Sequence, residues 1–138
     1  MIRRQVGGWT ILSVREFDTY ESLGYSAGSQ RWEHYGKWVI VDKVEHIREY
    51  AMSLMKFLGK GDIHRFEYSD NPAKNVPSGY DDDCHLLVVY ADDREKVTGS
   101  SSQKDRVQTI LSQVTGFDKN EMFWVYDRDD LKEFGIPR

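Results

Sequence analysis

The most regular hydrophobic pattern lies between Tyr35 and Asp70, and it predicts a strand, a helix and a second strand in direct succession. β-Branched and aromatic residues dominate Gly36 to Val41, as is typical of a short strand. From Val44 to Leu58, apolar residues recur at alternating spacings of three and four, which places them along one side of a helix. In the segment 61–68 apolar and polar residues alternate, which indicates a strand with one buried face. Because the connections are short, we expect the two strands to be neighbours in one sheet, with the helix across its back.

Polar residues and a glycine mark the two ends of this helix. Asp42 has a side chain that accepts hydrogen bonds from the free N–H groups of a first helical turn, and Glu45 would complete a capping box. Gly59 suits the left-handed conformation in which many helices end. We therefore expect the helix to begin just after Asp42 and to stop at Gly59.

The rest of the chain predicts three further strands and a second long helix. The near-continuous apolar run from Cys84 to Tyr90 is typical of a central strand covered on both faces. The helix is expected to begin after Ser102, which forms a cap with Asp105, and to end at Gly116. The other expected elements are strands at 9–14 and 121–126, a closing helical turn at 127–134 with Asp127 as its cap, and loops at 15–30, 69–83 and 91–102.

This order of elements is typical of an α+β domain. We predict one domain over residues 1–138, with a curved, mainly antiparallel sheet of about five strands and two main helices on one of its faces. The uncovered face, if it is concave, is where a ligand is expected to sit.

Composition narrows the classes of function. The formal net charge of −4 argues against general nucleic-acid binding, because proteins of that class are normally basic. Cys84 is the single cysteine, so no disulfide is expected within the chain, and a soluble cytoplasmic protein fits best. No stretch has the length and apolar character of a membrane span. The spacing of the Cys, His, Asp and Glu residues matches no zinc or calcium motif, so neither a metal nor another cofactor is expected.

Three stretches are similar to those of a known family: 35–40, 84–93 and 123–136. In order and spacing they resemble the basophilic-leukaemia-expressed protein family, whose uncharacterised members are also described as phosphothreonine-lyase-like domains. The resemblance covers residues 31–137. It implies the fold of the cap-binding translation initiation factor, which is a bent antiparallel sheet backed by helices. It also implies a distant link to bacterial enzymes that remove phosphate from phosphothreonine by β-elimination.

The resemblance suggests an enzymatic role for two residues. A phosphothreonine lyase needs a lysine base, a histidine acid at the leaving oxygen and cations that hold the phosphate. Lys37 lies in the family's strand motif and would clamp the phosphate, while His64 would be the acid. Glu67 occupies the place where the resemblance implies the lysine base, and a glutamate beside a phosphate is repelled by it.

Binding without catalysis is the leading hypothesis. Lys37, His64, Arg65 and His85 would converge on one sheet face and hold a small anionic or phosphorylated ligand. In the alternative interpretation, Lys37 and Arg65 are exposed strand residues and His85 is a core residue with its hydrogen bonds satisfied.

Aromatic and acidic residues offer other possibilities. Tryptophans such as Trp38, with Glu67 as an acidic partner, would suit a cationic methylated purine, although aromatic residues in strands are more often part of a core. The aromatic strand 122–126 would serve an interaction module if it exposed an apolar patch. The aspartates at 81–83 and 92–93 are interpreted as solvated loops in preference to a site for a hard cation.

Overall fold

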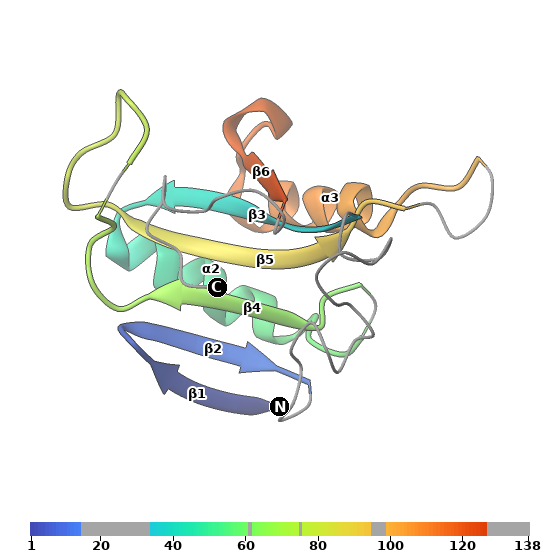
Figure 1. Ribbon diagram of the computed structural model, residues 1–138, viewed down its shortest axis with the longest axis horizontal. Coiled ribbons are helices and arrows are strands. Elements are labelled where there is room, and N and C mark those ends of the chain that lie inside the picture. Colours follow the sequence, from blue (N-terminus) through green and yellow to red (C-terminus); the bar gives the residue numbers. More distant parts are fainter. Residues whose placement is uncertain (15–33, 61, 75, 95–98, 127–138) are drawn as a thin grey trace.

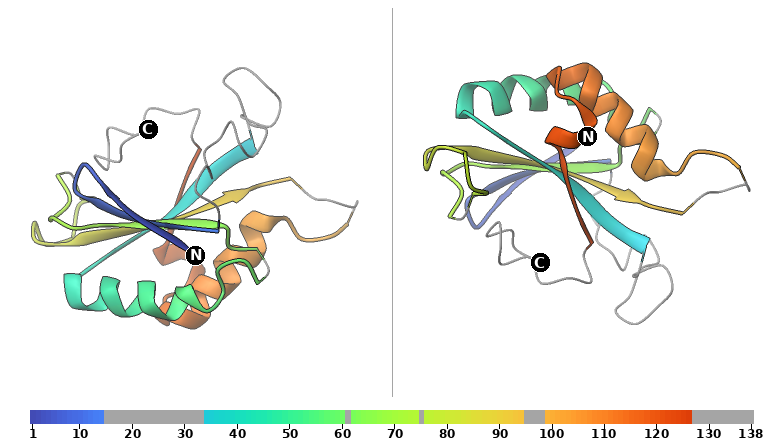
Figure 2. Two further views of the ribbon diagram at one scale, coloured as in Figure 1. Left: turned by 90° about the horizontal axis from the view of Figure 1, so that it is seen from below. Right: turned by 90° about the horizontal axis from the view of Figure 1, so that it is seen from above.

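Six strands form one antiparallel sheet, and two helices cover one of its faces (Figure 1; Figure 2). The computed structural model describes residues 1–14, 34–60, 62–74, 76–94 and 99–126. The elements in chain order are β1 (Ile2–Val6), β2 (Trp9–Ser13), β3 (Tyr35–Asp42), α2 (Val44–Met55), β4 (Arg65–Ser69), β5 (His85–Asp92), α3 (Gln103–Thr115), the short 3₁₀ helix η1 (Lys119–Glu121) and β6 (Phe123–Tyr126). The predicted α+β class, with an antiparallel sheet and two helices on one face, is confirmed. The loop predicted at 15–30 and the helical turn predicted at 127–134 lie outside the described residues.

The chain begins with a hairpin that the sequence interpretation missed. β1 pairs with β2 in antiparallel register, so that Val6 faces Trp9 across the two-residue turn Gly7–Gly8. Both glycines have positive φ, at 57° and 85°. The two-residue turn whose twist best matches that of paired strands requires positive φ at both of its central residues. Glycine adopts positive φ without steric cost.

β5 is the centre of the sheet and separates the two strands that flank α2. The strand order is β1-β2-β4-β5-β3-β6, so residues 36–41 and 62–68 contribute strands to one sheet as predicted, but the expectation that these strands are neighbours is wrong. β5 pairs with β3 over eight residues on one side and with β4 on the other. β3 and β4 are therefore parallel to each other with an antiparallel strand between them, and α2 makes the crossover that a parallel connection needs.

The ends of α2 differ from the prediction. The cap position is Lys43, which makes no side-chain cap hydrogen bond, and Asp42 is the last residue of β3. The Asp42 carboxylate instead accepts hydrogen bonds from the Lys43 N–H and from the Tyr50 hydroxyl. The helix ends at Met55, and Gly59 (φ 78°) lies in the turn that follows, where its N–H donates to the carbonyl of residue 63.

The ends of α3 are as predicted. The Ser102 side chain accepts a hydrogen bond from the Asp105 N–H at 3.2 Å. Gly116 ends the helix in the left-handed conformation, with φ of 77°. Val107 and Leu111 are fully buried against the sheet.

Hydrophobic clusters lie on both faces of the sheet. In the helix-side core, α2 and α3 pack against sheet residues that point toward the helices, for example Phe66, Leu87 and Val89. These residues alternate along the strands with residues that point to the opposite face. The opposite face, which we call the helix-free face, has its own cluster, with members such as Val39 and Val88. Every residue of β5 is buried, as the apolar run predicted. None of the described helices is long and apolar enough to cross a membrane.

Candidate functional site

The sheet register places two cations on either side of one tyrosine on the helix-free face. Lys37 of β3 pairs with Tyr90 of β5. Phe66 of β4 pairs with Val89, so Arg65, the preceding residue of β4, lies next to Tyr90 on its other side. Cross-strand neighbours in an antiparallel sheet share a face, so these side chains of three adjacent strands form one row. We call Lys37, Arg65, Tyr90 and the nearby Glu67 the buried cation cluster.

Both cations contact the tyrosine ring. The Lys37 Nζ lies 5.0 Å from the centre of the Tyr90 ring, and the Arg65 Cζ lies 4.7 Å from it. A cation held against an aromatic ring is attracted by the negative charge of the ring face, more strongly where water is excluded. Tyr35 stacks on Tyr90 from β3, with ring centres 5.9 Å apart and planes 18° apart, which fixes the ring that the cations share.

Glu67 is the acidic member of the buried cation cluster. Its Oε1 accepts a hydrogen bond from the Tyr90 hydroxyl at 2.6 Å, and its Oε2 lies 3.3 Å from a terminal nitrogen of Arg65. Glu67 lies on the diagonal from Tyr90, since its direct partner on β5 is Val88. The carboxylate thus orients both the phenol and the guanidinium.

The cluster is buried although no described helix covers it. Lys37 is fully buried, Glu67 and Tyr90 are nearly so, and the Arg65 side chain is only slightly exposed. Charged groups inside a protein are costly unless opposite charges or hydrogen bonds compensate them.

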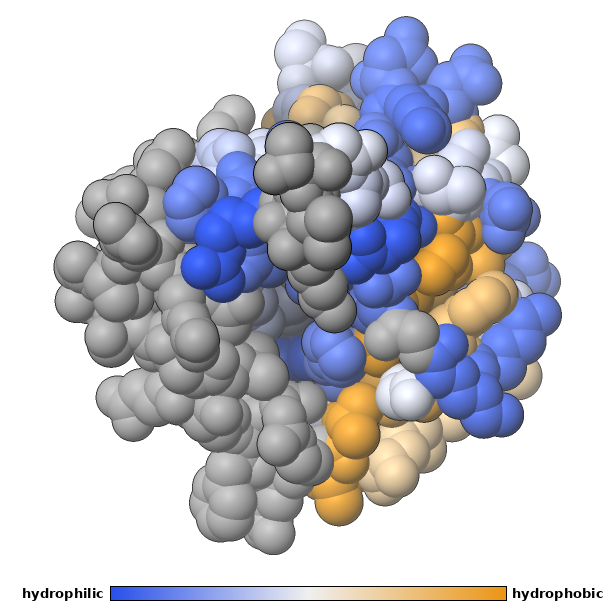
Figure 3. All heavy atoms as spheres, turned by 90° about the vertical axis from the view of Figure 1, so that its right-hand side faces the viewer, coloured by the Kyte–Doolittle hydropathy of each residue, from blue (hydrophilic) through white to orange (hydrophobic). Residues whose placement is uncertain are grey.

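The described surface at the end of the sheet where β4 begins and β5 ends is largely hydrophilic, with a hydrophobic area beside it (Figure 3). The cluster combines an ammonium, a guanidinium and a phenol, which are the groups that recognise carboxylate and phosphate oxygens.

The structure brings together some of the residues proposed for an anion site and separates others. Lys37 and Arg65 share one face. Because Lys37 is fully buried, the interpretation of Lys37 as an exposed strand residue is wrong. His64 directly precedes β4 and is exposed, and is thus not buried with Lys37. His85 lies at the opposite end of β5 from Tyr90, where its Nδ1 is 2.9 Å from the carbonyl oxygen of residue 69, as expected of a satisfied core residue.

Trp38 points to the other face of the sheet. It belongs to the helix-side core, and its Nε1–H donates to the Lys104 carbonyl at 2.9 Å. Trp124 packs edge-on against it with ring centres 5.2 Å apart, while Trp9 belongs to the cluster of the helix-free face. These three tryptophans are therefore not placed to form a base sandwich with one another, because their rings lie on opposite faces or already contact each other. Trp32, the fourth tryptophan of that hypothesis, lies outside the described residues.

The acidic and aromatic segments have structural partners. Asp81 and Asp83 both bind the Lys43 ammonium, at 2.8 and 2.9 Å. In the part of the chain that the structure describes, no group of three or more His, Cys, Asp or Glu residues is placed to hold a metal ion. The residues of β6 are half-buried, and the large apolar side chains exposed among the described residues lie elsewhere, on β1, on α2 and at residues 1 and 14.

Tyr90 is the member of the buried cation cluster that the sequence interpretation missed. It ends the apolar run 84–90, and nothing in that run distinguishes it from a core residue. Its role depends on the register that places it between Lys37 and Arg65, and a register between distant segments is not visible in a local pattern. No protein-family model matches this chain, and no curated protein matches its sequence.

Proposed function

We propose that the protein binds a small anionic or phosphorylated ligand through the buried cation cluster on the helix-free face. The observation that carries this proposal is that Lys37 and Arg65, from two different strands, approach the same Tyr90 ring within 5.0 Å. Both cations raise the positive potential beside this ring, so an anion bound there would be stabilised by both.

The geometry supports selectivity for a planar or tetrahedral oxyanion. Arg65 offers a rigid fork of N–H donors, and Lys37 offers an ammonium on a flexible stem. The Glu67 carboxylate holds the guanidinium at 3.3 Å and would orient it before a ligand arrives. The same carboxylate repels anions, so the proposed site is expected to have modest affinity and to discriminate strongly between monoanions and neutral molecules.

The phosphothreonine lyase alternative has less support. Lys37 and Arg65 could hold a phosphate, but elimination also needs a base at the α-carbon and an acid at the leaving oxygen. Glu67 is the acidic group that contacts Arg65, and His64 is exposed outside the buried cluster. We therefore favour binding over catalysis.

Calorimetric titration with inorganic phosphate and with a phosphothreonine peptide tests the proposal. Lys37→Met and Arg65→Met should each abolish the measured binding, because each removes one cation and keeps an apolar stem. Glu67→Gln should tighten binding by about fivefold or more, since it removes a negative charge beside the anion. Lys119→Met is the matched control, because Lys119 is exposed on η1 and should bind no ligand.

The outcomes separate the hypotheses. No binding by the parent protein, or equal binding by the parent and Lys37→Met, would contradict an anion site in this cluster. Mass spectrometry of the peptide after incubation tests the alternative, because β-elimination leaves a dehydrated residue and free phosphate. Detection of that residue with the parent but not with Lys37→Met would replace the binding proposal by the enzymatic one.

A further inference from the structure

A second candidate site lies at the opposite end of β3 from the buried cation cluster. A pocket of about 420 Å³ opens between the end of β3, the first turns of α2, the loop before β5 and the segment that follows α3. β6 pairs with β3 only from Gly36 to Val39, so the pocket lies beside the part of β3 that β6 leaves uncovered. Its volume is within the range typical of sites for small molecules.

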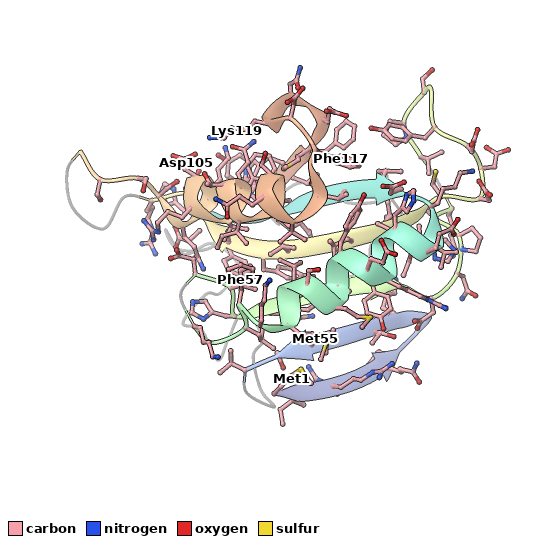
Figure 4. All side chains as sticks on the ribbon, turned by 180° about the vertical axis from the view of Figure 1, so that it is seen from behind. Met1, Met55, Phe57, Asp105, Phe117 and Lys119 are labelled. Atoms are coloured by element: carbon pink, nitrogen blue, oxygen red, sulfur yellow. The ribbon has the colours of Figure 1, made fainter. Side chains whose placement is uncertain are left out.

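Aromatic rings from three segments line this pocket. Tyr50 comes from α2, Tyr80 from the loop before β5, and Phe117 from the segment after α3. The rings of Tyr50 and Phe117 lie 6.0 Å apart with their planes at 73°, so together they make a corner. Phe117 lies at the end of α3 opposite Asp105 (Figure 4). Aromatic walls that meet at such an angle are a common arrangement for holding an organic cation.

The charge of the lining is negative. The lining holds three carboxylates, those of Asp42, Asp81 and Glu121, and the single ammonium of Lys43, so its formal charge is −2 when His46 is neutral. Burial raises the pKa of Asp42, but hydrogen bonds from Tyr50, His46 and the Lys43 N–H outweigh it and hold the pKa below its usual range. The carboxylate at the base of the pocket is therefore ionised at neutral pH.

The carboxylates of Asp42 and Glu121 already accept hydrogen bonds from the protein. Asp42 accepts from Tyr50 at 2.7 Å, and its other oxygen lies 3.0 Å from the His46 Nδ1. The Glu121 Oε1 accepts from the Asp118 N–H at 2.9 Å. A primary ammonium ion would need acceptors for its own N–H groups, whereas an alkylated ammonium needs only negative potential and aromatic faces.

We propose that this pocket binds a small quaternary ammonium compound between the rings of Tyr50, Tyr80 and Phe117. The aromatic faces contact the N-methyl groups, and the surrounding carboxylates supply the opposite charge. The site is separate from the buried cation cluster, and the proposal does not depend on the anion-binding function.

Saturation-transfer NMR with choline as the probe tests this inference on the full chain. Irradiation of the protein should attenuate the N-methyl signal of choline. The neutral carbon isostere of choline, in which a carbon replaces the charged nitrogen, should give a much weaker effect. Tyr80→Leu should abolish the signal, because leucine keeps the apolar contact and removes the ring. Glu121→Gln should weaken binding by about fivefold, because glutamine keeps the capping acceptor and loses the charge.

Asp105→Asn is the control for loss of charge. It removes one carboxylate at the far end of α3 and should leave choline binding unchanged. Equal transfer to choline and to its neutral isostere would overturn the proposal, since the pocket would then select shape without charge. Absence of transfer at tens of millimolar choline, or binding unchanged by Tyr80→Leu in a variant whose circular dichroism matches the parent, would also overturn it.

Discussion

Replacing Glu67 by glutamine should destabilise the fold and, if the proposed function is correct, strengthen anion binding at the same time. Glu67 is 2% exposed and Arg65 has 15% side-chain exposure, so little solvent screens their interaction. Glutamine has the same shape and can still accept the hydrogen bond from Tyr90, which keeps about 1 kcal/mol. It cannot supply the negative charge that faces the Arg65 guanidinium. Leaving a buried charge without its partner typically costs about 3–5 kcal/mol, and with the Tyr90 hydrogen bond retained we expect a loss of about 3 kcal/mol in the free energy of unfolding.

Urea unfolding followed by tryptophan fluorescence measures this loss, and a double-mutant cycle locates its cause. Arg65→Met in the Glu67→Gln background removes the cation that Glu67 contacts, so the double variant should be more stable than the sum of the single changes by about 1 kcal/mol or more. Glu49→Gln, at an exposed position of α2, should change stability by less than about 0.5 kcal/mol. A Glu67→Gln protein as stable as the parent, or strict additivity with Arg65→Met, would refute the idea that Glu67 compensates the buried charge of Arg65.

Three further predictions concern the fold. Gly36→Ala places a methyl group 2.6 Å from the Trp124 ring, so β6 must move away from β3. The free energy of unfolding, measured in urea, should fall by about 2 kcal/mol. An unchanged urea midpoint would show that β6 does not pack as described. The pKa of Asp42 is lowered, so its contribution to stability is present above its unfolded pKa and is lost as the pH falls through the folded value. The pKa of His46 is raised, chiefly by its hydrogen bond to Asp42. The His46 contribution is therefore present below about pH 6.5 and is lost as the pH rises through the folded value. Asp42→Asn should flatten both limbs of a plot of urea midpoint against pH, and a variant with the parent's profile would contradict this assignment. Ser102→Ala removes the cap of α3 and should cost about 1 kcal/mol in thermal unfolding, whereas an unaltered melting temperature would mean that the cap contributes nothing.

The elements that could be predicted from the sequence are those whose causes are local. The cap at Ser102 and the left-handed end at Gly116 depend on residues within one helix, and both were predicted. The apolar run of β5 needs only its own composition to indicate a strand buried on both faces. The Gly7–Gly8 hairpin was also local, since two glycines between strand-forming residues are a recognised turn signal, but the polar residues of β1 concealed the first strand.

The candidate site was less predictable because it depends on pairing between distant segments. Arg65 and Glu67 are two positions apart in one strand, so alternation alone puts them on one face, and that is where they lie. Whether Lys37 joins them depends on β5, which comes from a much later part of the chain and enters between β3 and β4. Asp42 shows the opposite error: its residue type favours a cap, but a longer β3 includes it, and Tyr50 and His46 use its oxygens instead. Tertiary pairing overrode the local preference in both cases.

The central place of β5 has a consequence for how the protein is made. During synthesis the ribosome releases β1 to β4 and α2 well before residues 85–92, so a nascent chain holds two strands whose inner edges await the same late partner. Open edges of this kind attract other chains. We therefore expect a chain stopped before residue 85 to aggregate, and amide hydrogens along 86–91 to be among the last of the described residues to exchange with solvent in the finished protein.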